Sequence, residues 1–182
     1  MMEQYYELHV AGLTRKLKKI PISDDLTIAS FVMLGDTELI ERTAEELFHR
    51  LPEGIEILVC PEAKGIPLTH VIANKLGIDY VIIRKSVKGY MEEPLVQKVR
   101  SITTREPQII VLDGLDAEKI KGKKVCIVDD VVSTGGSLKA VEELLEQADC
   151  TIIAKAAVLL EEGGYNGEDL IYLERLPVFS RS

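Results

Sequence analysis

The chain has no tryptophan and few other aromatic residues, since aromatic side chains make up 5% of its 182 residues. It also lacks a long hydrophobic run: the stretch 156–160 is far shorter than the ~20 apolar residues that a membrane-spanning helix needs. The first residues, MMEQYYELH, contain neither a basic region nor an apolar stretch, so no secretory signal is expected. These absences predict a cytoplasmic protein without a membrane partner.

Cysteine and positive charge are also scarce. Cys60, Cys126 and Cys150 lie far apart without C-x-x-C spacing, which argues against a disulfide framework and a structural zinc site. Buried, reduced thiols are expected instead. The chain has 22 basic and 30 acidic residues, so its net charge is −8. A nucleic-acid binder usually carries a basic footprint, and no nucleic-acid partner is therefore expected.

What the sequence does contain is an alternation of short apolar runs and helix-period segments. This pattern is typical of an α/β fold with a mostly parallel sheet flanked by helices, and the length fits one domain. Asp36 is the expected N-cap of the first core helix. We expect buried strands at 55–60, 80–83, 124–129 and 151–160, and helices at 36–50, 65–76 and 136–148.

Two regions break this alternation. Residues 4–22 are expected to form a pair of strands that precedes the core. Residues 86–106 show little strand or helix signal, and a segment of that length in a small domain is usually a functional lid or disordered. The sequence thus predicts an α/β core with two additions.

The most specific feature is the segment 125–138, VCIVDDVVSTGGSL. A buried strand ends in Asp129 and Asp130, a turn of small residues follows, and a helix begins. In open α/β sheets ligands bind at the carboxyl ends of strands, and the N–H groups of 133–137 at a helix N-terminus would bind an anion. Two carboxylates suit such a site if the ligand also offers hydroxyls or brings a hydrated Mg²⁺, as a sugar phosphate does. An acidic turn before an N-capped helix is the plainer interpretation.

Other phosphate-binding motifs are missing from the sequence. It contains no G-x-x-x-x-G-K-[ST] and no G-x-G-x-x-G after the first strand, so neither a P-loop NTPase nor a dinucleotide fold is supported. The segment 125–138 instead resembles the phosphoribosyl-pyrophosphate motif of the type I phosphoribosyltransferases. PEAKG at 61–65 resembles the pyrophosphate loop of that family, and IRK at 83–85 resembles the strand end that precedes its mobile lid.

The resemblance covers roughly residues 20–180 and is closest to adenine phosphoribosyltransferases and related purine enzymes. It implies the type I phosphoribosyltransferase fold in a single domain, with a small N-terminal hood at 1–35 and a core at 36–182. Within that core it implies a mobile lid loop at about 86–106.

The resemblance also implies a role for each matching residue. The ribose hydroxyls, the 5-phosphate and the pyrophosphate would each have their own set, one residue would handle a proton, and one would stack on the base. The ribose set is Asp129 and Asp130; the 5-phosphate set is Ser133, Thr134, Gly135, Gly136 and Ser137; the pyrophosphate set is Ala63, Lys64, Gly65, Arg84, Lys85 and Lys88; the catalytic proton handler is Glu106; and the base-stacking residue is Phe31.

Some of these residues have plainer interpretations. Lys64 could be a solvated loop lysine, Arg84 a strand-end charge, Glu106 a lid glutamate in water and Phe31 a core residue. Lys64 also stands where purine enzymes of this type commonly carry arginine. The sequence at 101–108, SITTREPQ, lacks the Ser-Tyr pair that is typical of adenine-specific lids.

The implied reaction displaces pyrophosphate from the ribose C1 of phosphoribosyl pyrophosphate by a nitrogen of a free nucleobase. Adenine is expected ahead of hypoxanthine, guanine and xanthine, and orotate ranks below the purines. Mg²⁺ would arrive on phosphoribosyl pyrophosphate, so no protein metal site is expected, and a homodimer is implied. The altered lid leaves open a non-catalytic regulatory protein of the same fold that binds phosphoribosyl pyrophosphate.

Overall fold

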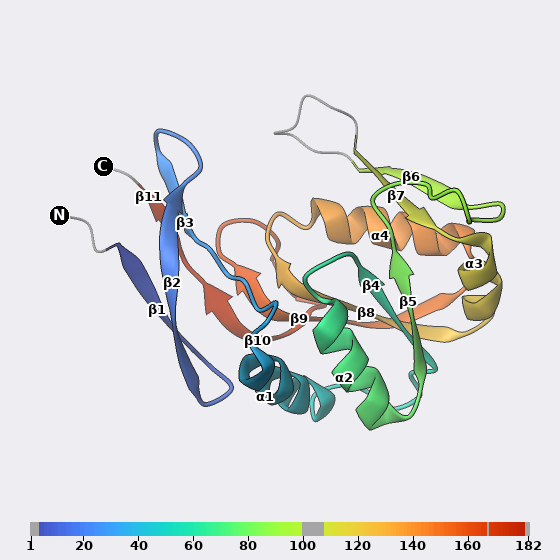
Figure 1. The fold of residues 1–182 in the computed structure, drawn as a ribbon, viewed down its shortest axis with the longest axis horizontal. Helices are drawn as coiled ribbons and strands as arrows, with labels where there is room; N and C mark the ends of the chain where they lie inside the picture. Colours follow the sequence, from blue (N-terminus) through green and yellow to red (C-terminus); the bar gives the residue numbers. More distant parts are fainter. Residues whose placement is uncertain (1–3, 100–107, 167, 181–182) are drawn as a thin grey trace.

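The computed structural model describes residues 4–99, 108–166 and 168–180 (Figure 1). Its strands form a five-stranded sheet, a four-stranded sheet and a two-stranded ribbon. The five-stranded sheet has the order β10-β9-β8-β4-β5 and consists of β4 (Ile57–Pro61), β5 (Asp79–Ile83), β8 (Lys124–Val132), β9 (Thr151–Glu161) and β10 (Ile171–Leu176). All of its neighbouring strands are parallel, which confirms the predicted α/β architecture.

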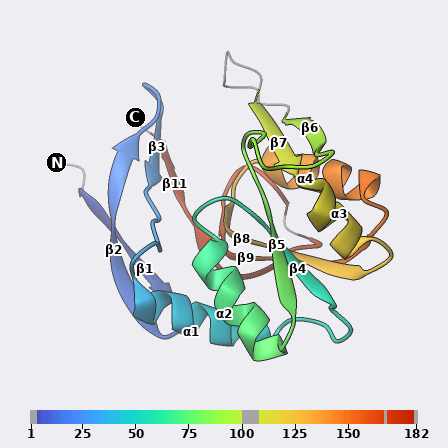
Figure 2. The same cartoon turned by 45° about the vertical axis from the view of Figure 1, so that its right-hand side comes forward.

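Helices cover both faces of this sheet (Figures 1 and 2). One face packs against α1 (Thr37–Phe48) and α2 (Ile66–Leu76), with Leu39, Leu47, Leu68 and Ile72 fully buried. The other face packs against α4 (Gly136–Gln147) and the short α3 (Gly114–Ile120), with Ile120, Val141 and Leu144 buried. Because the central strands are covered on both faces, they are nearly continuous apolar runs, as their sequences predicted.

The hood is a separate antiparallel sheet with the order β1-β2-β3-β11. Its strands are β1 (Tyr5–Val10), β2 (Leu13–Pro21), β3 (Leu26–Ala29) and β11 (Val178–Ser180). The first two confirm the predicted strand pair, whereas β11 comes from the other end of the chain. β11 pairs antiparallel with β3. Nζ of Lys19 on β2 lies 4.1 Å from the centroid of the Phe179 ring on β11, so a cation–π contact also links these two strands of the hood.

The hood is attached to the core through the start of α1. The carboxylate of Asp36 accepts a hydrogen bond from the backbone N–H of Leu39, which confirms the predicted N-cap. The same carboxylate pairs with Arg15 of β2, at 2.6 Å from its Nε. The Arg15 guanidinium therefore holds the pKa of Asp36 below its ordinary value, against the opposing effect of burial.

Within the predicted lid, the expectation of little regular structure is wrong for residues 95–99. Residues Leu95–Val99 form β6, which pairs antiparallel with β7 (Gln108–Leu112) and packs on α4. The inward face of β6 carries Gln97. Its Nε2 donates a hydrogen bond to Oε2 of Glu143 at 2.7 Å, and its Oε1 accepts one from Nε2 of Gln147 at 2.9 Å. A polar inward residue removes the apolar alternation by which a strand is recognised in a sequence.

No helix in the described part of the chain is long and apolar enough to cross a membrane.

Candidate functional site

The carboxyl ends of β4, β5 and β8 lie at one edge of the parallel sheet, and a cleft of about 180 Å³ opens there. It brings together three of the sequence segments to which the resemblance assigned ligand contacts. The lining residues are Pro61, Glu62, Ala63, Lys64, Ile83, Lys85, Ile110, Asp129, Asp130, Ser137 and Val141. Pro61–Lys64 and Asp129–Asp130 are more than 60 residues apart in the chain, so only the sheet topology makes them neighbours.

The two aspartates lie near the end of β8, which continues to Val132 and not only to Asp129 as predicted. The Oδ1 atom of Asp129 accepts a hydrogen bond from the backbone N–H of Asp130 at 2.8 Å. Burial, together with the negative charge of Asp130, raises the pKa of the Asp129 carboxyl. The Oδ2 atom of Asp130 is buried and has no hydrogen-bond partner among the described residues. An unpaired buried acceptor is costly, and a ligand hydroxyl would satisfy it.

The turn between β8 and α4 has the form of an anion site. Gly135 has a φ of +81°, a left-handed conformation that favours glycine, and it precedes α4 without a side-chain cap. The first N–H groups of α4 are therefore left available, except that the N–H of Gly136 faces Thr134 Oγ1 at 3.4 Å. Thr134 and Ser137 are exposed, so their hydroxyls are accessible to a ligand.

The loop 61–65 packs directly on the aspartate pair. A methyl group added to Gly65 would lie 3.2 Å from the Cα of Asp129 and 3.3 Å from the backbone nitrogen of Asp130. Gly65 itself is buried, whereas Ala63 and Lys64 are exposed beside the cleft. This placement indicates that Gly65 acts through close packing, and that Ala63 and Lys64 are the residues of this loop that a ligand in the cleft can contact.

Glu62 also lines the cleft, although the family resemblance implies no role for it. Its carboxylate accepts a hydrogen bond from the backbone N–H of Lys85 at 2.7 Å and one from Nη1 of Arg84 at 3.2 Å. These contacts, with the hydrogen bond from Lys85 as the larger cause, hold the pKa of Glu62 below its ordinary value. Glu62 therefore joins the β4 loop to the end of β5, and no sequence motif marks such a pairing.

The basic residues at 84, 85 and 88 are not equivalent. Lys85 lines the cleft, whereas the Arg84 side chain lies against Glu62 and the Lys88 ammonium donates to Ser86 Oγ at 2.7 Å. The Arg84 backbone also exchanges two 2.8 Å hydrogen bonds with Val111, which attaches β7 to the edge of the sheet. Of these three basic residues, Lys85 is thus the one whose side chain lines the described cleft.

Three further sequence predictions have different outcomes. Phe31 is 4% exposed and packs in the core, so its ring is occupied by neighbouring side chains. Glu106 lies outside the described residues. Cys60 and Cys126 are buried as predicted, but Cys150 is only half-buried, which corrects the expectation for that thiol.

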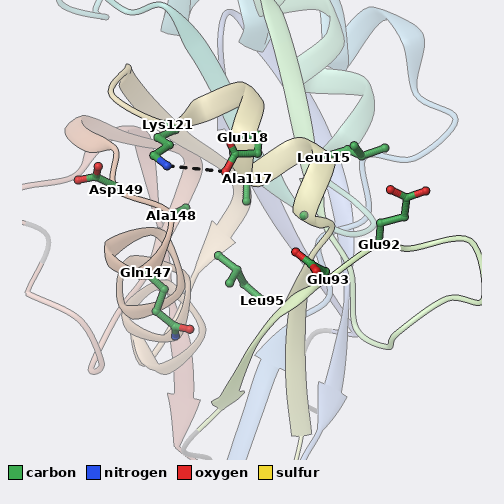
Figure 3. Close-up of a pocket in the computed structure, with 11 residues that line it drawn as sticks. Glu92, Glu93, Leu95, Leu115, Ala117, Glu118, Lys121, Gln147, Ala148 and Asp149 are labelled. Atoms are coloured by element: carbon green, nitrogen blue, oxygen red, sulfur yellow. Dashed lines mark ion pairs between the residues drawn. The ribbon is translucent and has the colours of Figure 1, made fainter.

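A second, larger hollow of about 740 Å³ lies elsewhere, between β6, α3 and the end of α4 (Figure 3). Lys121 and Asp149, which line it, precede β8 and β9, so the hollow lies at the amino ends of these strands. Its other charged side chains are Glu92, Glu93 and Glu118. We assign the site to the smaller cleft, because ligands of parallel sheets bind at the carboxyl ends and because an acidic lining repels phosphate.

Comparison with known proteins identifies the family of the chain. A family model described as a phosphoribosyl transferase domain matches residues 34–177. A hypoxanthine/guanine phosphoribosyltransferase of Methanothermobacter thermautotrophicus is 32% identical over 152 residues, which cover 79% of this chain and 75% of the relative. An adenine phosphoribosyltransferase of Streptococcus thermophilus is 35% identical over 118 residues, which cover 64% of each chain.

The fold has solved counterparts as well. The crystal structure of adenine phosphoribosyltransferase from Thermoanaerobacter pseudethanolicus aligns with a TM-score of 0.73 at 21% identity, over 87% of this chain and 95% of that one. Its likeness shows the type I fold that the resemblance implied. The chain therefore belongs to the phosphoribosyltransferase family of enzymes, and the relatives that it matches are purine phosphoribosyltransferases.

Proposed function

We propose that this chain transfers ribose 5-phosphate from phosphoribosyl pyrophosphate to a free purine base, with release of pyrophosphate. The observation that carries the proposal is the composition of the cleft at the carboxyl ends of β4, β5 and β8. A pair of carboxylates, Ser137 at the end of the proposed phosphate-binding turn, and a loop with nearby lysines line the same small volume. These three groups match the diol, the phosphate monoester and the diphosphate of one ligand.

The chemistry of each group supports this assignment. Asp129 and Asp130 offer acceptors for the ribose hydroxyls, and the buried Oδ2 of Asp130 would gain the partner that it lacks in the described residues. The backbone donors at the start of α4 suit the 5-phosphate. Lys64 and Lys85 supply positive charge where negative charge accumulates on the leaving diphosphate. The protein aligns the reactants and stabilises the leaving group.

Magnesium would enter with the diphosphate as part of the substrate. The described residues include no group of three or more histidine, cysteine, aspartate or glutamate side chains that could hold a metal ion. The aspartate pair nevertheless fits a hydrated Mg²⁺, because its carboxylate oxygens are the ligand type that this ion prefers. Bound beside them, the ion would neutralise charge on the diphosphate.

Of the parts of the substrate, the base is the one whose identity the cleft residues indicate least. The order and spacing of the motifs favour adenine, whereas the matched relatives include enzymes named for hypoxanthine and guanine as well as for adenine. We keep adenine as the expected base and Glu106 as the proposed proton handler. The burial of Phe31 instead favours its interpretation as a core residue.

The test is a turnover assay with Mg²⁺ and phosphoribosyl pyrophosphate against adenine, hypoxanthine, guanine, xanthine and orotate. We expect pyrophosphate release that depends on the presence of a purine, with the matching nucleoside 5-monophosphate as product. Tight binding of phosphoribosyl pyrophosphate without turnover on any base would instead establish the regulatory alternative. Absence of binding would reject the site assignment.

The same preparation tests the predicted assembly. By analogy with the family we propose a homodimer. Light scattering after size-exclusion chromatography should then give twice the 20.2 kDa mass of the chain.

A further inference from the structure

A buried ammonium group lies behind the phosphate-binding turn, and the proposed reaction does not use it. Lys155 of β9 is 8% exposed in an otherwise apolar part of the strand. Its Nζ atom lies 2.6 Å from Oε1 of Glu142 on α4, and it also hydrogen-bonds Asp169 and the hydroxyl of Tyr165. A buried charge is stable only when it is fully paired, so these partners hold the Lys155 side chain in one place.

Tyr165 connects this cluster to the turn. Its hydroxyl bonds both Lys155 and Asp169, while its backbone N–H donates to the carbonyl oxygen of Ser133 at 2.9 Å. Its ring packs against Gly135, since a methyl group added there would lie 2.6 Å from the Cδ2 atom of Tyr165. The ring and the backbone of Tyr165 thus both contact the turn that precedes α4.

The hydrogen bond to Ser133 also fixes the orientation of the peptide group that joins Ser133 to Thr134. In a trans peptide the C=O and N–H groups point in opposite directions. Because the Ser133 carbonyl points towards Tyr165, the N–H of Thr134 in the same peptide points away from Tyr165. The contact with Tyr165 therefore orients a donor of the anion site without touching the ligand.

We infer that Tyr165, held in place by Lys155 and Asp169, is a positioning residue that sets the affinity of the turn for the 5-phosphate end of the substrate. The inference rests on the proposed function, in which residues 133–137 bind that phosphate. Neither Tyr165 nor Lys155 lines the described cleft. Both act through the backbone of the turn.

Two variants test the inference without removing the packing of the ring. Tyr165→Phe keeps the ring against Gly135 and removes the hydroxyl, and Lys155→Met keeps a long side chain and removes the charge. The partners of Lys155 can be rehydrated, since the side chains of Glu142 and Asp169 are 30% and 57% exposed. Tyr172→Phe, which removes the hydroxyl of a tyrosine on β10, is the matched control.

Calorimetric titration with ribose 5-phosphate and with pyrophosphate separates the two ends of the substrate. We expect both variants to bind ribose 5-phosphate about 10-fold more weakly and pyrophosphate as the wild type does, because a misoriented donor affects one end only. In turnover, KM for phosphoribosyl pyrophosphate should rise while kcat changes less than about 2-fold, since uniform binding is lost. The control should match the wild type throughout.

Several results would contradict the inference, and they differ in what they mean for the proposed function. Equal losses for both ligands, or losses that only follow a drop in thermal stability, would show a general structural role and overturn the inference. Unchanged affinity for ribose 5-phosphate in both variants would also overturn it and leave the proposed function intact. If the wild-type protein binds neither ribose 5-phosphate nor phosphoribosyl pyrophosphate, the proposed function fails, and this inference fails with it.

Discussion

Gly65 and Asp129 approach so closely that a methyl group on Gly65 would lie 3.2 Å from the Cα of Asp129. The same methyl group would lie 3.2 Å from Sγ of Cys60. Backbone atoms of β8 cannot move aside as the end of a flexible side chain can. The loop 61–65 and the aspartate pair are thus held at a separation that leaves little room for a β-carbon at residue 65.

We expect Gly65→Ala to displace this loop from the aspartate pair by a few tenths of an ångström. Misalignment of reacting groups by up to 1 Å can cost about 100-fold, so kcat/KM for phosphoribosyl pyrophosphate should fall roughly 10- to 100-fold. Overpacking should also lower the free energy of unfolding by about 1–3 kcal/mol. Steady-state kinetics and urea denaturation measure the two effects. Gly89→Ala, whose methyl group would meet nothing within 4 Å, should not change the stability. Wild-type kinetics in Gly65→Ala would contradict the prediction.

Asp129→Asn should stabilise the protein without ligand and abolish binding of phosphoribosyl pyrophosphate. The raised pKa of Asp129 means that the folded state holds the proton more tightly than the unfolded chain does. The stabilising contribution of Asp129 is therefore fully present below its ordinary pKa of 3.8 and is lost as the pH rises through the folded pKa.

At pH 7 the asparagine variant avoids this loss, and its melting temperature should rise by about 2–4 °C for each kcal/mol gained. The difference from the wild type should disappear near pH 3. Calorimetric scans at several pH values, with the exposed Asp24→Asn as a control, measure the effect. A variant that is less stable at pH 7, or that binds the ligand normally, would show that Asp129 does not have this role.

Glu62→Gln should lose the attachment between the β4 loop and the end of β5. The lowered pKa of Glu62 means that its stabilising contribution is present above the ordinary value of 4.5 and is lost as the pH falls through the folded pKa. At pH 7 the variant should be less stable by about 1 kcal/mol, because a charge-assisted pair at the edge of a cleft is partly screened by water.

As the pH falls through the folded pKa of Glu62, the stability difference between the wild type and the Glu62→Gln variant should shrink, because the carboxyl becomes protonated. Denaturation curves at pH 3, 5 and 7 measure the change, and Glu53→Gln on the surface is the control. A stability difference that persists at pH 3 would indicate a loss of packing and not of charge.

The cysteines should react very differently with a thiol reagent. Burial raises the pKa of Cys60 and of Cys126 to about 12, so their thiolates are scarce at pH 8 as well as shielded. Cys150 is half-buried and should react slowly, since burial raises its pKa too. Titration with a chromogenic disulfide should detect at most one thiol in the native protein and three after unfolding. Rapid labelling of Cys60 would show that the cleft opens at that residue.

Local signals explain which predictions were confirmed. The N-cap at Asp36 and the apolar core strands depend on residues within a few positions of each other. The segment 125–138 is also a local feature, because its strand end, its turn and its helix start are contiguous in the sequence. The strand β6 was missed since Gln97 occupies its inward face, and its partners on α4 are distant in the sequence.

By itself, therefore, the sequence determined the α/β class, the strand–turn–helix segment 125–138 and the family resemblance, since neighbouring residues encode each of them. Only the tertiary structure decided that β11 completes the hood, that Glu62 holds Arg84, and that Lys155 and Tyr165 lie behind the turn. These relationships join residues from separate elements, and the order of strands in a sheet decides which elements meet. No local pattern contains that information, because strand order follows from how the whole chain buries its apolar faces.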